Sequence, residues 1–194
     1  MSVTTFLVRR LAPSAVLLLA ASLAAAQGPQ QVVPAQSEIG FTSKQMGVPV
    51  DGKFRKWDAQ MSFDPKKLEA SRVAFSIDTG SASFGSPETD AEVPKAAWFN
   101  AAKFPQATFQ SSGIKALGGN KFEVAGKLSI KGSVRDVVVP VALAQAGTVT
   151  TATGAFTIKR LDFKIGEGEW ADTSMVANDV QVKFKLAVTG IGPL

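Results

Sequence analysis

Residues 121–131 read Lys-Phe-Glu-Val-Ala-Gly-Lys-Leu-Ser-Ile-Lys, and this stretch decides the fold class. Phenylalanine, valine, leucine and isoleucine take one set of alternate positions, while lysine, glutamate and serine dominate the other set. Successive side chains of a β-strand point to opposite faces of the sheet. The stretch therefore predicts a strand with one face buried and the other face in water.

The same alternation recurs along most of the chain. It is clear over residues 72–78 and 179–188, and further strands are expected over residues 39–43, 50–54, 57–63, 107–112, 136–143 and 150–158. Between Phe54 and Trp57 the apolar phase slips by one residue, which predicts a bulge or bend. Turn signals separate the segments at residues 64–65, 117–120, 131–133 and 146–147.

Helical signals are few. Residues 66–71 follow Asp64-Pro65 and predict a single turn, and residues 93–103 predict one short helix that ends before Pro105. Many strands joined by short turns predict an all-β, antiparallel sandwich or barrel. We favour a barrel of about eight strands, because a sheet with one apolar face and few helices to cover it buries that face by curling on itself.

The first 26 residues differ from the rest. Arg9 and Arg10 precede an apolar run over residues 11–23, and three alanines follow at 24–26, which is typical of a secretory signal peptide cleaved after Ala26. The run is shorter than a membrane span and contains Pro13. We expect a flexible lead-in over residues 27–36, one domain over residues 37–194, and a periplasmic or secreted location.

The composition excludes several classes of site. The chain has no Cys, His or Tyr, so thiol nucleophiles, imidazole bases and the N/S ligands typical of zinc are absent, and we expect no metal site. The formal net charge is +5, and +3 without residues 1–26. Because the lysines are scattered singly, we expect no nucleic-acid partner.

Thirteen phenylalanines and three tryptophans are the most informative feature. Large aromatic side chains on the inner face of a barrel leave an apolar cavity of the kind that holds lipids, although they can equally form an ordinary core. The residues expected to form the apolar wall are Phe41, Phe54, Phe63, Phe75, Phe109, Phe156 and Trp170. Trp98, Phe99 and Phe104 are expected near an opening, as a lid or as a structural cap.

The segment 159–172 carries four carboxylates, and we count its Phe163 and Arg160 among the ligand-binding residues. At a barrel mouth, Arg160 would pair with an anionic head group such as a phosphate, whereas on a solvated loop it would pair with Asp162 or Asp90. A carboxylate-based hydrolase using the acidic residues at 167, 169 and 172 is an alternative. Binding of Ca²⁺ through the carboxylate oxygens is another alternative, although the acidic residues do not have the spacing of an EF-hand.

The order of motifs resembles the YceI family of exported lipid-binding proteins. The most specific piece is Trp98-Phe-Asn-Ala-Ala-Lys-Phe-Pro-Gln-Ala-Thr-Phe109. Other pieces that carry the resemblance lie at residues 37–42, 52–65, 68–73, 124–137, 159–163 and 179–188. Family members often have histidine where this chain has Gln36 and Gln45, so a role of those histidines does not carry over.

The resemblance implies an extended, lipocalin-like antiparallel barrel with a long apolar tunnel for a polyisoprenoid tail. It implies a binding or carrier protein, not an enzyme, whose partner is a lipophilic small molecule, polyprenyl or quinone-like, with no cofactor other than a bound isoprenoid lipid. A non-catalytic interaction module for a membrane redox protein is the main alternative, in which the barrel would be filled by its own side chains.

Overall fold

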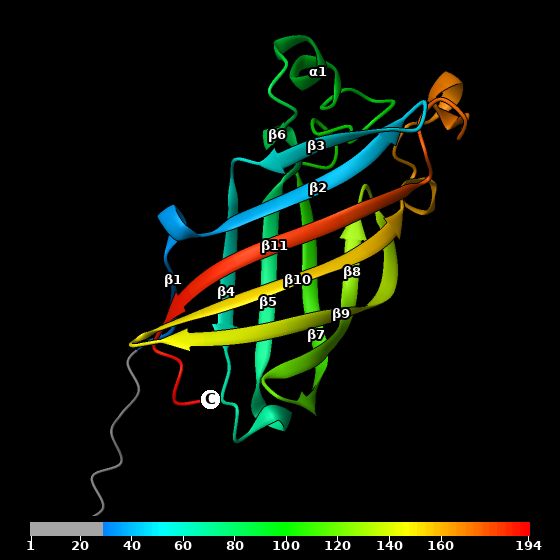
Figure 1. The fold of residues 1–194 in the computed structure, drawn as a ribbon. Helices are drawn as coiled ribbons and strands as arrows, with labels where there is room; N and C mark the ends of the chain where they lie inside the picture. The colour runs from blue at the N-terminus through cyan, green and yellow to red at the C-terminus, as the bar shows by residue number, and fades with distance from the viewer. Residues whose placement is uncertain (1–28) are drawn as a thin grey trace, which may run out of the picture.

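The computed structural model describes residues 29–194, which form one curled antiparallel sheet with short connections (Figure 1). Its nine long strands are β2 (Glu38–Gln45), β3 (Val48–Phe54), β4 (Trp57–Ser62), β5 (Arg72–Asp78), β7 (Gln106–Gly118), β8 (Lys121–Ile130), β9 (Ser133–Ala146), β10 (Val149–Lys159) and β11 (Asp179–Thr189). All nine predicted strands are present. The all-β antiparallel barrel class is confirmed, and the single sheet rules out the sandwich. The signal peptide predicted for residues 1–26 lies outside the described residues.

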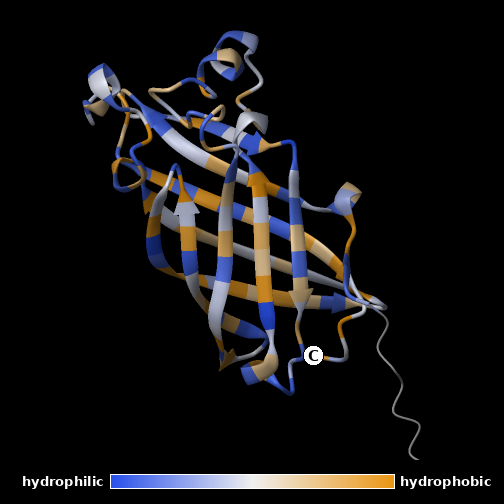
Figure 2. Ribbon diagram, turned by 180° about the vertical axis from the view of Figure 1, so that it is seen from behind, coloured by the Kyte–Doolittle hydropathy of each residue, from blue (hydrophilic) through white to orange (hydrophobic). Residues whose placement is uncertain are grey.

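The strands keep the alternation that the sequence shows. Along β8 the buried residues are Phe122, Val124, Gly126, Leu128 and Ile130, and the positions between them are more exposed. Figure 2 shows the same alternation of hydrophobic and hydrophilic residues along the strands of the sheet. The apolar set therefore lines the inside of the curl.

Tight reversals hold the register of neighbouring strands. Three hairpins turn in two residues that both have positive φ, at Met46-Gly47, Gly119-Asn120 and Lys131-Gly132. Loops with this backbone match the right-handed twist of the strands they join. These turns fix which side chains of each strand face inward.

The hydrogen-bonded path runs β4-β5-β7-β8-β9-β10-β11-β2-β3, followed by the two-residue strand β6 (Ala82–Ser83). β3 ends at Phe54 and β4 begins at Trp57, which is where the sequence predicts a break. At this corner the Arg55 amide donates to the Ser81 carbonyl and the Asp78 amide donates to the Lys56 carbonyl, each at 3.0 Å. The corner brings the two ends of the sheet together.

The segment before β2 also connects the two edges of the sheet, at the end opposite this corner. The side-chain amide of Gln30 donates to the Phe63 carbonyl at 2.6 Å and accepts from the Phe63 amide at 2.8 Å. Strand β1 (Gln31–Val32) pairs with β11, and the 3-10 helix η1 (Pro34–Gln36) follows. The expected flexible lead-in is therefore corrected for residues 30–36, because their hydrogen bonds tie them to the sheet.

The described part of the chain contains one short α-helix, but it lies before the predicted range. Helix α1 (Pro87–Glu92) begins where the Ser86 hydroxyl accepts from the Thr89 amide, with Pro87 at the first helical position. Residues 93–103, predicted to be helical, form consecutive turns. Asn100 has φ +51°, in the left-handed region, so a right-handed helix cannot continue through it.

The remaining connections are short 3-10 turns. They are η2 (Leu68–Ala70), η3 (Thr79–Ser81), η4 (Arg160–Phe163) and η5 (Gly168–Ala171). η2 falls inside the helical turn predicted for residues 66–71. Within residues 29–194 no helix has the length and apolar character needed to cross a membrane.

Candidate functional site: an internal apolar cavity

The curled sheet encloses a cavity of about 710 Å³. Every long strand contributes inward-facing side chains to its lining. It runs from Phe63, Phe122 and Ile191 at one end to α1 and the β2–β3 turn at the other. The volume lies within the roughly 300–1,000 Å³ typical of small-molecule sites.

Aromatic rings form much of the wall. Phe41 of β2 lies 5.3 Å from the ring of Phe54 and 5.1 Å from that of Phe84, and Phe54 in turn lies 6.0 Å from Phe99. The rings meet edge to face or tilted, as aromatic pairs prefer. The result is a continuous apolar surface from β2 to the segment after α1.

Two glycines on neighbouring strands leave room for rings of this wall. Gly52 is paired with Phe41, and a Cβ on Gly52 would lie within 2.6 Å of two atoms of the Phe41 ring. Gly154 is paired with Phe184 in the same way, with a Cβ only 2.5 Å from the ring. Each ring can thus lie against the backbone of the next strand, which keeps the interior open.

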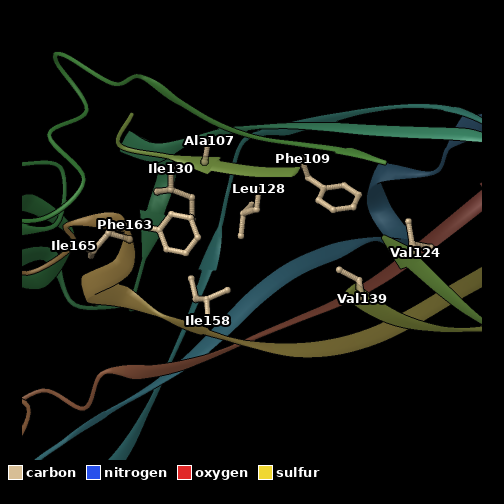
Figure 3. Close-up of a cluster of buried hydrophobic side chains, with 9 residues drawn as sticks. All are labelled: Ala107, Phe109, Val124, Leu128, Ile130, Val139, Ile158, Phe163 and Ile165. Carbon is tan, nitrogen blue, oxygen red and sulfur yellow. The ribbon is translucent and has the colours of Figure 1, made fainter. Parts of the chain in front are cut away.

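A dry cluster supports one side of the cavity (Figure 3). Its buried members come from β7 to β10 and from the segment after β10: Ala107, Phe109, Val124, Leu128, Ile130, Val139, Ile158, Phe163 and Ile165. In Figure 3 the ring of Phe163 lies between Ile130 and Ile158. This packing anchors η4 to the sheet.

The structure places ten of the twelve predicted site residues on the cavity lining: Phe41, Phe54, Phe63, Phe75, Trp98, Phe99, Phe109, Phe156, Arg160 and Trp170. Phe104 is not on it, because its ring packs against the β8–β9 turn at Gly132. Phe163 is not on it either, because its ring packs inside the dry cluster between Ile130 and Ile158.

Sequence reasoning missed several lining residues. Phe122 and Phe184 belong to the apolar set of two clearly alternating strands, so the signal was present, while Phe84 lies outside any predicted element. Valines, isoleucines and leucines of the inward faces complete the lining. The predicted residues were almost all aromatic, so the prediction left out the aliphatic side chains that share the lining.

Arg160 is a structural residue of the fold. All five of its N–H groups donate to backbone carbonyls, at 2.6 to 3.1 Å, those of Ile165, Gly166, Trp170, Val176 and Ala177. The residue is 1% exposed, and this burial lowers the pKa of its guanidinium. The predicted pairing with Asp162 or Asp90 is therefore wrong, and no donor is left for a head group.

A second buried cation ties the neighbouring loops together. The Lys131 ammonium donates to the carbonyls of Ala96 and Lys164, at 2.8 and 2.7 Å, and pairs with Glu167 at 2.8 Å. The Lys131 side chain is 4% exposed. It joins the β8–β9 turn to the loop that contains Ala96 and to the loop that contains Lys164 and Glu167.

The same two loops also meet directly. The amides of Gly166 and Glu167 both donate to the Ala97 carbonyl, at 2.8 and 2.9 Å. The rings of Trp98 and Trp170 lie 5.4 Å apart on the cavity lining. Together with Lys131 these contacts form a cap over part of the cavity, made of residues 96–98 and 164–170.

The acidic segment does not assemble a carboxylate pair in the cavity. Glu167 is bound to Lys131, and Glu169 is exposed outside the cavity lining. Asp172 accepts from the amide and hydroxyl of Ser174, and these bonds hold its pKa below the ordinary value. A general acid requires the opposite shift.

Asp90 fastens α1 to the corner of the sheet. Its carboxylate accepts from the Phe84 amide at 2.6 Å and from the Ser83 hydroxyl at 2.7 Å, and pairs with Arg55 at 3.0 Å. The hydrogen bonds from Phe84 and Ser83, helped by Arg55, hold the pKa of Asp90 below its usual value. The carboxylate is therefore ionised at neutral pH.

Polar lining side chains gather at the α1 end, which we call the mouth. They are Ser43 and Gln45 of β2, and Glu88, Thr89 and Glu92 of α1. Met46 and Met175 also line this end and are 77% and 47% exposed. The interior is thus apolar along its length, with one polar end.

Comparison with known proteins places this architecture in a family. A family model described as a YceI-like domain matches residues 30–188. A UPF0312 protein of Azotobacter vinelandii is 40% identical over 88 residues, which are 45% of this chain and 46% of the relative. One of Vibrio cholerae is 31% identical over 114 residues, which are 58% and 60%. The matched segments thus span about half of these curated relatives.

Solved structures agree over a larger part of the chain. The crystal structure of Burkholderia cenocepacia BcnA is 46% identical and superposes with a TM-score of 0.79, covering 81% of this chain and 99% of that one. A polyisoprenoid binding domain from Saccharophagus degradans, implicated in plant cell wall breakdown, superposes at 0.65 with 17% identity, covering 83% and 98%. The latter likeness shows a shared fold.

Proposed function

This chain belongs to the family of YceI-like domains, and from that premise we propose that it binds one long apolar lipid, such as a polyisoprenoid, inside its cavity. The observation that carries the proposal is the continuous cavity of about 710 Å³ with its aromatic and aliphatic lining. A related fold whose printed description is a polyisoprenoid binding domain supports the choice of ligand.

The energetics favour a ligand of this class. Transfer of each CH₂-sized unit from water to an apolar site contributes about 0.8 kcal/mol, so a long prenyl chain gains enough to offset the costs of association. The interaction-module alternative expects a barrel filled by its own side chains, and the open interior argues against that expectation.

We place the protein outside the cytoplasm, as a periplasmic or secreted carrier or store of the lipid. The signal peptide expected over residues 1–26 supports this location. The role is binding without chemistry, which agrees with a cavity whose lining is almost wholly apolar and whose arginine is fully engaged in backbone hydrogen bonds.

Native mass spectrometry with lipid extraction tests the proposal on protein isolated from the periplasm. We expect one prenyl lipid per chain, and reloading of the delipidated protein with added polyprenol. The variant Ala152→Phe places a large ring on the cavity lining and is expected to lower the occupancy, whereas Ala144→Phe on the exposed side of β9 is the matched control. Delipidated protein that takes up no prenyl lipid would overturn the proposal.

A further inference from the structure

One hydroxyl group on the lining of the mouth makes no hydrogen bond to any residue that the structure describes. Ile39, Phe41, Ser43 and Gln45 form the inward face of β2, so Ser43 continues an apolar row into the polar end. Ser43 is 8% exposed, and within residues 29–194 its hydroxyl makes no hydrogen bond. The hydroxyl faces the cavity, where it can donate a hydrogen bond to a ligand atom or accept one from it.

The other polar groups at the mouth are mainly hydrogen-bond acceptors. Glu88 and Glu92 of α1 carry carboxylates, and Glu92 is already paired with Lys95. Glu88 forms no ion pair with any described residue. The end of a ligand that reaches this mouth therefore meets negative charge and an available hydroxyl.

No free cation balances these carboxylates on the lining. Arg160 is the single Lys or Arg side chain among the lining residues that the structure describes, and its five N–H groups are all bound to carbonyls. A phosphate needs donors or positive charge in a partly buried site. At this mouth it would lie beside the Glu88 carboxylate without a free cation, and the donors among the described lining residues there are neutral hydroxyl and amide groups.

We propose that the mouth selects a lipid whose polar end is uncharged and donates a hydrogen bond, such as an alcohol or phenol, and rejects the phosphorylated form of the same chain. This rests on the proposed function and names its ligand more closely. Ser43 accepts the ligand's hydrogen bond or donates to its oxygen, and Glu88 both accepts from a hydroxyl and repels an anion.

Competition between matched lipids tests this inference. The delipidated protein is mixed with equal amounts of geranylgeraniol and geranylgeranyl monophosphate. Native mass spectrometry then measures how much protein carries each lipid. We expect the alcohol to exceed the phosphate by about tenfold, since one unfavourable charge contact of about 1.4 kcal/mol corresponds to that ratio.

Two variants with matched controls assign the selectivity to the mouth. Glu88→Gln removes the negative charge and keeps an oxygen that accepts from a hydroxyl, so it is expected to raise the bound phosphate several-fold and to lower the ratio of alcohol to phosphate. Glu69→Gln on the exposed η2 turn should leave that ratio at the wild-type value. Ser43→Ala is expected to lower the affinity for the alcohol by roughly three- to tenfold. Ser62→Ala, on the exposed face of β4, is its control.

Failure of the selectivity and failure of the proposed function give different results. If the phosphate binds as well as the alcohol, or if Glu88→Gln leaves the ratio unchanged, the inference about the mouth is overturned and lipid binding stands. If neither lipid binds, nor the corresponding hydrocarbon without a polar end, both proposals fall together.

Discussion

The ring of Phe184 on β11 lies over the backbone of Gly154 on β10, its partner in register. A Cβ at position 154 would come within 2.5 Å of the ring and 2.4 Å of the Pro140 carbonyl oxygen on β9. Any side chain larger than hydrogen must therefore displace either the neighbouring strand or the ring. Because the ring faces the cavity, its displacement reduces the space available to a lipid.

The substitution Gly154→Ala is expected to destabilise the protein by about 1–3 kcal/mol, the usual cost of overpacking, and to lower lipid occupancy. Urea unfolding followed by tryptophan fluorescence gives the first quantity, and native mass spectrometry of the reloaded protein gives the second. Gly113→Ala is the control, because nothing lies within 4 Å of a Cβ there. Equal stability of the two variants would contradict the close approach.

Arg160 offers a test between a structural role and a role in head-group binding. Arg160→Lys keeps the charge but has three donors for five carbonyls, so at least two buried acceptors lose their partner. We expect the free energy of unfolding to fall by about 3 kcal/mol. The exposed Arg135→Lys should change it by less than about 0.5 kcal/mol.

The readout distinguishes the two roles cleanly. A residue that only bound a head group would leave the unfolding free energy of the lipid-free protein unchanged upon replacement by lysine. Thermal and urea unfolding of delipidated Arg160→Lys, compared with Arg135→Lys, therefore decides the matter, and unchanged stability would restore the head-group role that the sequence suggested.

The strands could be predicted from the sequence because a two-residue period is a local signal. The alternation at residues 121–131 needs no knowledge of the partner strand, and the slip between Phe54 and Trp57 marks the corner of the sheet directly. The length of β7 was underestimated, because the strand predicted over residues 107–112 continues in pairing with β8 as far as Gly118, past a register shift between Ser111 and Gly113 that interrupts the alternation. In that part of β7 the end of the strand is determined by hydrogen bonding to β8, and the hydropathy pattern does not mark it.

The roles of the charged residues could not be predicted because they depend on distant backbone. The partners of Arg160 are carbonyls brought together by the turns of residues 165–177, and no residue type encodes a free carbonyl. Likewise, Lys131 looks like an exposed turn lysine, yet folding places its ammonium between two loops. The helix begins at Ser86-Pro87, a start signal that precedes the aromatic run on which the helix predicted over residues 93–103 rests.

Lys131 is expected to control the opening of the cap over residues 96–98 and 164–170. Lys131→Met preserves much of the side-chain bulk but removes three hydrogen bonds, so both loops lose a shared anchor. We expect faster amide exchange in both loops and roughly tenfold faster release of a bound polyprenol. The amides of β8 should exchange as in the wild type.

The matched control for this variant is Lys121→Met at the exposed start of β8. Hydrogen exchange followed by mass spectrometry, with a parallel measurement of lipid transfer to acceptor vesicles, reports both effects. Protection of residues 96–98 and 164–170 that equals the wild type would show that the ammonium does not hold the cap.

Acidification is expected to loosen α1 from the corner of the sheet through Asp90. Hydrogen bonds from Phe84 and Ser83, with Arg55, hold the pKa of Asp90 in the folded protein below its ordinary value of 3.8. A carboxyl whose pKa is lower in the folded state stabilises that state fully above the unfolded-state pKa, and the contribution disappears as pH falls through the folded-state pKa.

The wild type should therefore be more stable than Asp90→Asn at pH 7, and the difference should shrink below about pH 4. Urea unfolding of both proteins between pH 7 and pH 2 measures it, with Asp136→Asn on the exposed side of β9 as the control. A stability difference that stays constant down to pH 2 would mean that ionisation of Asp90 does not fasten the helix.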